Sequence, residues 1–215
     1  MRRTFLELLI IVSANSITCA PLTTGSGDNS DDGQTSSGVP RDAAEELVLA
    51  VGTPALTVIE YADFQCPYCG QFARETFPTI RAQYIETGKV RWVFRHYPLT
   101  NMHPYAWKAA EAAQCANEQG AFWAYHGLLF NHQDALQVDR LKSYASDLSL
   151  DRSLFDSCLD GGSEAGEVQD DVNEGLKDGV SGTPTFVING HDFVGTRSVQ
   201  EMSDLLDGIL NSNQD

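Results

Sequence analysis

Two cysteines separated by a proline and a tyrosine, Cys66-Pro67-Tyr68-Cys69, lie between two segments of opposite character, and this placement constrains the chain strongly. The preceding run, residues 56–62, is rich in β-branched and aromatic residues and predicts a strand. The following run, residues 71–86, spaces its apolar residues as one face of a helix requires. We therefore expect Cys66 at a helix N-terminus, where Pro67 suits the first position and free N–H groups favour a thiolate. A thiolate is the nucleophile of disulfide exchange, so the motif indicates redox chemistry with Cys66 as the exposed, reactive thiol.

The same spacing is also half of a zinc site, or a small structural loop. A zinc site needs a second pair of ligands at comparable spacing. Cys115 and Cys158 stand alone, and His126 and His132 follow far downstream. The strand-turn-helix context therefore favours a redox pair, and we expect neither a metal nor a cofactor.

A second signal lies in residues 179–190. Residues 186–188 predict a buried strand, and Asn189-Gly190 predicts a hairpin turn into a second short strand at 192–194. Pro184, at the start of the first strand, is ordinary there because it blocks only one ladder bond. A cis peptide is the rarer X-Pro state, so the residues alone leave the isomer open.

Taken together, the motifs resemble those of the DsbA-like thiol:disulfide oxidoreductases of the thioredoxin superfamily. The resemblance runs from about residue 51 to the C-terminus and is carried by residues 57–69, 106–116, 120–126, 128–130 and 182–184, in family order. It implies an α/β thioredoxin fold with an inserted helical domain at about 101–180. It also implies a redox pair at Cys66 and Cys69, with Pro67 and Tyr68 between them, and a cis Pro184 that presents the backbone of Thr183 to a substrate.

Three further residues gain meaning from the resemblance. Glu60, six residues before Cys66, matches the buried carboxylate that exchanges protons with the inner cysteine, whereas strand alternation alone permits a solvent-facing charge equally well. Cys115 and Cys158 match cysteines that are paired in some relatives, and we expect a structural disulfide between them; buried free cysteines are the alternative.

Four aromatic residues are expected to form the core of the insertion: Trp107, Phe122, Trp123 and Phe130.

The N-terminus has the pattern of an export signal. Two arginines precede a short apolar run, which predicts a signal peptide at 1–18. Cys19 is interpreted as a lipidated residue, because a tether rich in Ser, Gly and Asp follows at 19–40 and because its removal leaves an even number of cysteines. Ordinary cleavage after Ser16 is the competing interpretation. The domain itself is predicted at 41–215.

The composition of the chain limits the classes of molecule that it is expected to bind. A formal net charge of -16 argues against binding to nucleic acid, and a hydrophobic content of 42% over 215 residues allows a substantial core. We expect a monomeric, extracytoplasmic oxidant that exchanges its disulfide with cysteines of exported proteins. A DsbB-like or VKOR-like membrane partner would reoxidise it. An isomerase or reductase of the same fold, and a non-enzymatic metal-binding protein, are the alternatives.

Overall fold

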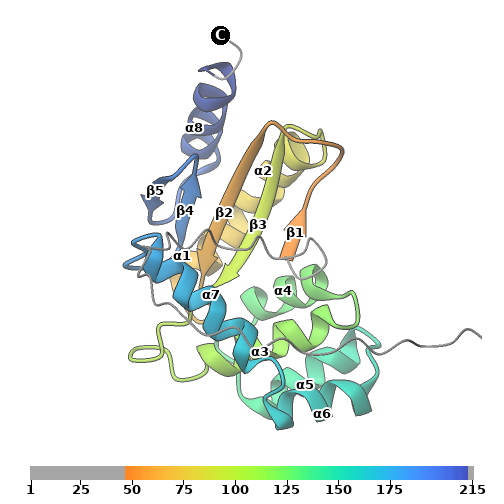
Figure 1. Ribbon diagram of the computed structural model, residues 1–215. Helices are drawn as coiled ribbons and strands as arrows, with labels where there is room; N and C mark the ends of the chain where they lie inside the picture. Colours follow the sequence, from red (N-terminus) through yellow and green to blue (C-terminus); the bar gives the residue numbers. More distant parts are fainter. Residues whose placement is uncertain (1–46, 213–215) are drawn as a thin grey trace, which may run out of the picture. The chain divides into compact units, whose positions relative to one another are not determined.

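The computed structural model describes residues 47–212 (Figure 1). By its internal contacts the chain separates into two units, 1–39 and 40–215, and the second contains every helix and strand described below. The predicted signal peptide 1–18, Cys19 and the predicted tether 19–40 lie outside the described residues.

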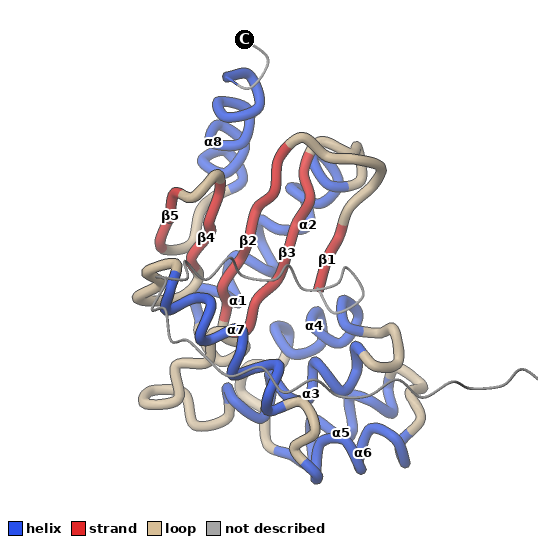
Figure 2. Tube along the Cα trace, viewed as in Figure 1, coloured by secondary structure: helices blue, strands red, loops and turns tan. Residues whose placement is uncertain are grey.

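A five-stranded mixed sheet forms the centre of the domain (Figure 2). Its strands lie in the order β1 (Leu47–Leu49), β3 (Val90–His96), β2 (Leu56–Ala62), β4 (Thr185–Ile188) and β5 (His191–Val194). Only β2 and β3 are parallel; the other neighbours are antiparallel. The predicted hairpin is present, with Asn189 and Gly190 at positive φ between β4 and β5. The predicted strands of residues 56–62, 186–188 and 192–194 are therefore confirmed.

The parallel pair β2 and β3 is joined by one helical crossover, as such a pair requires. The crossover contains α1 (Pro67–Gln71), η1 (Phe72–Thr76), α2 (Phe77–Ile80) and η2 (Arg81–Ile85), of which η1 and η2 are π-helical turns. Pro78 has no N–H to donate to the preceding turn, which accounts for the break in the regular pattern near the start of α2. The predicted helix at 71–86 is confirmed in extent, but its interruptions were not predicted.

Five helices lie between β3 and β4. Four of them gather at one end of the sheet: α3 (Ala106–Asn117), α4 (Phe122–Asn131), α5 (Val138–Asp147) and α6 (Arg152–Gly161) (Figure 1). The fifth, α7 (Ala165–Lys177), packs on β3, and the terminal α8 (Val199–Ser212) packs beside α2. This arrangement is the α/β thioredoxin fold with a helical insertion that the sequence predicted. Within residues 47–212, no helix has the length and apolar character to cross a membrane.

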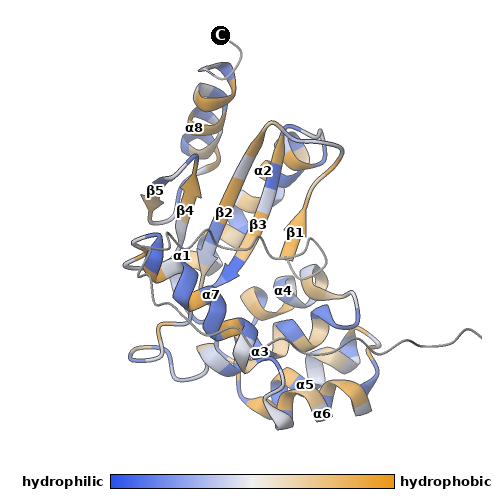
Figure 3. Cartoon of the chain, viewed as in Figure 1, coloured by the Kyte–Doolittle hydropathy of each residue, from blue (hydrophilic) through white to orange (hydrophobic). Residues whose placement is uncertain are grey.

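The two faces of the sheet pack differently. Phe72, Trp92 and Phe186 form an aromatic layer between the sheet and the crossover helices. On the other face, Tyr61 and Tyr97 form a cluster with Val180, next to α7. Figure 3 shows apolar colouring on β1 and over much of β2 and β3, hydrophilic colouring at the arrowhead of β3, and a mainly hydrophilic α7. A Cβ on Gly175 of α7 would lie 2.7 Å from the Tyr97 ring, so a glycine is needed for the helix to approach the sheet this closely.

The insertion has its own apolar core, and it contains two of the four aromatic residues predicted there. Phe122 and Phe130 are buried, and Trp123 is partly buried against them. Trp107 does not belong to this core: it is half-buried, and its indole N–H donates to Glu111 one helical turn away. The prediction for Trp107 was wrong because an indole that finds a partner on its own helix can remain at the surface.

Candidate active site

Cys66 lies where β2 ends and α1 begins. It is the N-cap residue of α1, with an extended backbone (φ -69°, ψ 123°), and Pro67 follows in the first helical turn. No side chain caps this helix, so the free N–H groups of its first turn are available to the Cys66 sulfur. The predicted position at a helix N-terminus is confirmed. The predicted exposure is not: Cys66 is only 4% exposed, because the loop that carries Thr183 lies against it.

The surroundings of Cys66 favour its thiolate. A hydrogen bond from the Cys69 side chain is the largest influence and helps to lower the pKa of Cys66 to about 5. Thr183 and the backbone N–H groups of Tyr68 and Cys69 lower the pKa further, while burial opposes them. No positively charged side chain is among these influences. These hydrogen bonds favour the ionised form of Cys66 at neutral pH.

Cys69 has the opposite character. It is completely buried, one helical turn after Cys66, and burial raises the pKa of its thiol well above the usual value. Its proton is also shared with Cys66, which raises the pKa again. Both cysteines are free thiols in this structure. The pair thus combines Cys66, whose lowered pKa favours the nucleophilic thiolate, with the buried Cys69, whose raised pKa favours the protonated thiol.

The second half of the site comes from the loop before β4. The Thr183–Pro184 peptide is cis, and the Thr183 carbonyl oxygen lies 3.3 Å from the Cys66 sulfur. The next residue begins β4, which pairs with β2 and so brings this loop to the end of the strand that leads to Cys66. Pro67 and Tyr68 lie at the surface beside it, Tyr68 with 60% of its area exposed.

Glu60 faces the interior. It is 2% exposed on β2, and its carboxylate accepts a hydrogen bond of 2.9 Å from the Trp92 indole. Burial raises the pKa of Glu60 to about 7, against the smaller opposite effect of that hydrogen bond. Strand alternation places Glu60 on the same face as Ala62, which packs in the same apolar cluster as Cys69. The solvent-facing alternative is excluded, and a carboxyl group with a pKa raised to about 7 lies inside the protein on the strand that leads to Cys66.

Two residues that sequence reasoning missed hold the loop before Cys66. Asp63 is buried, and its carboxylate accepts hydrogen bonds from the backbone N–H groups of Gln65 and Leu99 and pairs with the His103 ring at 2.7 Å. Gln65 in turn accepts from the backbone N–H of Tyr105. An Asp directly after a strand is a turn signal, so Asp63 was detectable. The contact partners of Gln65 gave no local signal.

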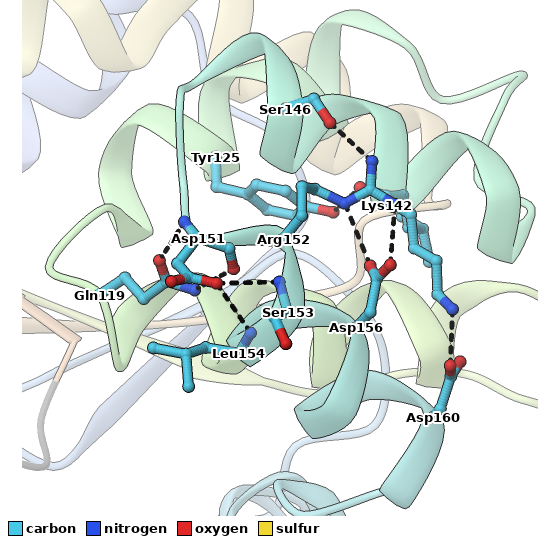
Figure 4. Close-up of polar contacts among 11 residues, drawn as sticks. Gln119, Tyr125, Lys142, Ser146, Asp151, Arg152, Ser153, Leu154, Asp156 and Asp160 are labelled. Atoms are coloured by element: carbon cyan, nitrogen blue, oxygen red, sulfur yellow. Dashed lines mark hydrogen bonds and ion pairs between the residues drawn. The ribbon is translucent and has the colours of Figure 1, made fainter.

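The predicted second pair is joined. Cys115 of α3 and Cys158 of α6 form a disulfide with a Cα–Cα distance of 5.9 Å. Polar contacts add to it at the same end of the insertion (Figure 4): Asp151 caps α6 by accepting from the backbone N–H groups of Ser153 and Leu154, and Gln119 bonds the Asp151 backbone. The disulfide therefore crosslinks two helices that are already in contact. In residues 47–212, no group of three or more potential ligands is close enough together to hold a metal ion.

Comparison with known sequences gives the family. The sequence profile of the family described as Thioredoxin matches residues 49–208. Two curated relatives from Salinispora, both named Na(+)/H(+) antiporter NhaA, are similar over 165 residues. NhaA 3 of S. tropica is 44% identical and NhaA 1 of S. arenicola 41% identical, each over 77% of this chain. The chain spans about a quarter of the length of these relatives.

Solved structures show the same fold. The α-DsbA1 of Wolbachia pipientis superposes with a TM-score of 0.71 at 23% identity, over 81% of this chain and 94% of that one. BdbD of Bacillus subtilis gives a TM-score of 0.69 at 24% identity, over 78% and 94% of the two chains. DsbA of Chlamydia trachomatis gives 0.72 at 14% identity, over 82% and 96%. The chain belongs to the thioredoxin family and has the DsbA-like form of its fold, with helices inserted between β3 and β4.

Proposed function

We propose that this protein is a thiol:disulfide oxidoreductase that exchanges a Cys66–Cys69 disulfide with the cysteines of exported proteins. The observation that carries the proposal is the asymmetry of the pair: a hydrogen-bonded Cys66 that favours the thiolate, next to a buried Cys69 that keeps its proton. The sulfur of Cys66 lies beside the Thr183 carbonyl, where an extended substrate backbone would pass. The fold and family are consistent with this chemistry but do not specify its direction.

The proposed reaction moves two electrons from a substrate dithiol to the enzyme. A substrate thiolate attacks the Cys66 sulfur, the Cys66–Cys69 bond breaks, and Cys69 leaves as a thiolate. Because Cys69 strongly favours its protonated form, it takes up a proton, and Glu60, with a pKa of about 7, is the proposed donor. A second substrate thiolate then attacks the substrate sulfur of the mixed disulfide. Cys66 leaves as a stabilised thiolate, and the substrate carries the new disulfide.

The low pKa of Cys66 supports the oxidising direction. A stabilised thiolate stabilises the reduced enzyme, so the disulfide form gives up its bond more readily. Tyr68 brings no positive charge to the thiolate, and the hydrogen bonds described above supply the stabilisation instead. An isomerase or reductase and a non-enzymatic metal-binding protein remain the alternatives.

The deciding experiment is an equilibrium of the protein with glutathione redox buffers, followed by exchange with a reduced peptide that contains two cysteines. The proposal expects a reduction potential well above that of thioredoxin, about -270 mV, and peptide oxidation that requires Cys66. A potential at or below the thioredoxin value would favour the reductase. Tight binding of Cu(I) or Zn(II) without any exchange would favour the metal-binding protein.

We also propose that the protein acts on the outer side of a membrane. The signal pattern of 1–18 and the lipidation of Cys19 belong to this proposal, as do the tether 19–40, the domain 41–215 and a DsbB-like or VKOR-like partner. The antiporter relatives support it, since they carry a similar segment within larger proteins named for transport of ions across membranes. Cell fractionation of the full chain, with mass spectrometry of its N-terminus, tests it. A soluble protein with unmodified Cys19 would contradict the lipid anchor.

A further inference from the structure

Gln133 lies in the loop that follows α4, within the helical insertion, yet its side chain bonds the backbone of the redox loop. Its amide nitrogen donates to the Phe64 carbonyl at 2.9 Å and to the Cys66 carbonyl at 2.8 Å. Both amide hydrogens are therefore used on carbonyls on either side of Gln65. These two bonds join the backbone of the redox loop directly to the insertion.

The Gln133 side chain is seated against α1. A Cβ on Gly70 would lie only 1.9 Å from the Gln133 side-chain oxygen, so this position needs a glycine as long as Gln133 keeps its place. Arg74 of η1 donates to the same oxygen at 3.1 Å and also to the Phe130 carbonyl at the end of α4. The amide is thus fixed at its oxygen by Arg74 and at its nitrogen by two carbonyls.

The Gln133 hydrogen bonds act at the start of α1, a helix with few stabilising interactions of its own. The helix is five residues long before the π-helical turn begins, and no side chain caps it. Short helices depend on tertiary contacts. The Cys66 carbonyl accepts from Gly70 N–H at 3.1 Å as the first bond of α1, and Gln133 is its second donor. Two donors on this oxygen also offset its partial negative charge next to the sulfur of the same residue.

We propose that Gln133 is a positioning residue of the redox centre: by holding the Phe64 and Cys66 carbonyls, the insertion fixes the start of α1 and the place of the Cys66 sulfur. The inference rests on the proposed function. Gln133 touches neither sulfur in the structure and acts through the backbone of Cys66. The helical insertion then has a part in thiol reactivity in addition to covering the site.

Four variants of the full chain test this proposal. Gln133→Met keeps a similar volume and length but has no donors, and Gln133→Ala removes the side chain. Gly70→Ala approaches the same contact from the other partner, since its methyl group would displace the Gln133 amide. In the double variant Gly70→Ala/Gln133→Ala the Gln133 side chain no longer obstructs the methyl group, and the remaining close atom, Arg74 Nη1 at 2.7 Å, is the end of a flexible side chain that can move aside. The matched control is Gln119→Ala, which removes a glutamine that likewise bonds backbone groups, but between α3 and α6 (Figure 4).

The readout is the pKa of Cys66 in the reduced protein, measured from the ultraviolet absorbance of its thiolate and from the rate of alkylation against pH. Gln133→Met, Gln133→Ala and Gly70→Ala should each raise the pKa of Cys66 by about 0.5 or more, a threefold loss of thiolate at acidic pH. The double variant should match Gln133→Ala, without an added shift. Gln119→Ala should leave the pKa unchanged even if it lowers stability.

Three results would overturn the proposal: an unchanged pKa in Gln133→Met, an equal shift in Gln119→Ala, or additive shifts from Gly70→Ala and Gln133→Ala. Thermal unfolding of each variant identifies any that do not fold, and Gln133→Met then carries the test alone. The titration requires no turnover. If wild-type protein shows no disulfide exchange, the proposed function fails by that result, whereas the titration still decides the role of Gln133.

Discussion

The two cysteine pairs of this protein lie in regions built on different principles. Cys66 and Cys69 belong to one helical turn at the end of a strand, with sulfurs in unequal surroundings and a neighbouring carbonyl from a distant loop. Cys115 and Cys158 join two separate helices of a packed insertion, with polar contacts that already connect those helices. The same side chain is thus prepared for exchange in one region and for crosslinking in the other. The difference teaches that reactivity comes from an asymmetry of environment and not from the presence of two nearby sulfurs.

The largest expected effect comes from removing the reactive thiol of the redox pair, Cys66. Cys66→Ser should reduce exchange to the uncatalysed rate, because the stabilised thiolate is lost, whereas Cys69→Ser should trap mixed disulfides with substrates. Alkylation of the reduced wild-type protein should modify Cys66 first, with a rate that rises through a midpoint near pH 5. Peptide mapping that found Cys69 as the first modified residue would reverse the assigned roles.

The double variant Cys115→Ala/Cys158→Ala tests the other side of the comparison. Loss of a crosslink with a sequence separation of 43 should lower the free energy of unfolding by about 2–4 kcal/mol, chiefly because the unfolded chain is less constrained. Exchange activity should stay within about twofold, since these sulfurs take no part in it. Denaturant unfolding and peptide oxidation measure the two quantities separately. A large loss of exchange in folded protein would show that the second pair is not purely structural.

Glu60→Gln sharpens the comparison by removing the proposed proton donor. The folded pKa is raised from 4.5 to about 7, so the wild-type protein loses stability as pH rises through this window, because the unfolded state releases its proton there while the folded state keeps it. At pH 8 the variant should therefore be more stable by about 1–3 kcal/mol, and at pH 4 the two should be equal. Its exchange rate should be lower and should lose its pH dependence near pH 7.

Denaturant unfolding at both pH values, with exchange rates across the range, checks this prediction. A variant with wild-type stability at pH 8 and an unchanged pH profile would remove Glu60 from the mechanism.

The smallest expected effect comes from changing the exposed Tyr68, which should alter the exchange rate but hardly the stability. Tyr68→Ser changes a side chain that is 60% exposed beside Cys66, so the free energy of unfolding should change by less than about 0.5 kcal/mol. Exchange with a peptide should slow more than exchange with glutathione, because only the larger substrate reaches beyond the sulfur. Parallel kinetics with both substrates test this, and equal effects on the two would exclude a role for Tyr68 in contact with the chain of the substrate.

The local parts of this structure were predictable from sequence, and the contacts between distant segments were not. Residues 56–62, Pro67 and Asn189-Gly190 carry short-range signals that determine a strand, a helix start and a hairpin. Glu60 could not be placed by alternation, because a strand has two faces and only the packing of Trp92 shows which one is inside. Family resemblance led to Cys115 and Cys158, and to Pro184. Gln133 had no signal at all, since its partners lie 67 and 69 residues away.

The contact between the Cys66 sulfur and the Thr183 carbonyl spans 117 residues of sequence. The ribosome makes the two cysteines first, then the whole helical insertion, and only afterwards the loop that completes their surroundings. A nascent chain that ends before Thr183 lacks this partner of the Cys66 sulfur and the strand β4 that follows it. The order of the elements along the chain therefore delays full assembly of the reactive centre until the loop before β4 has been made.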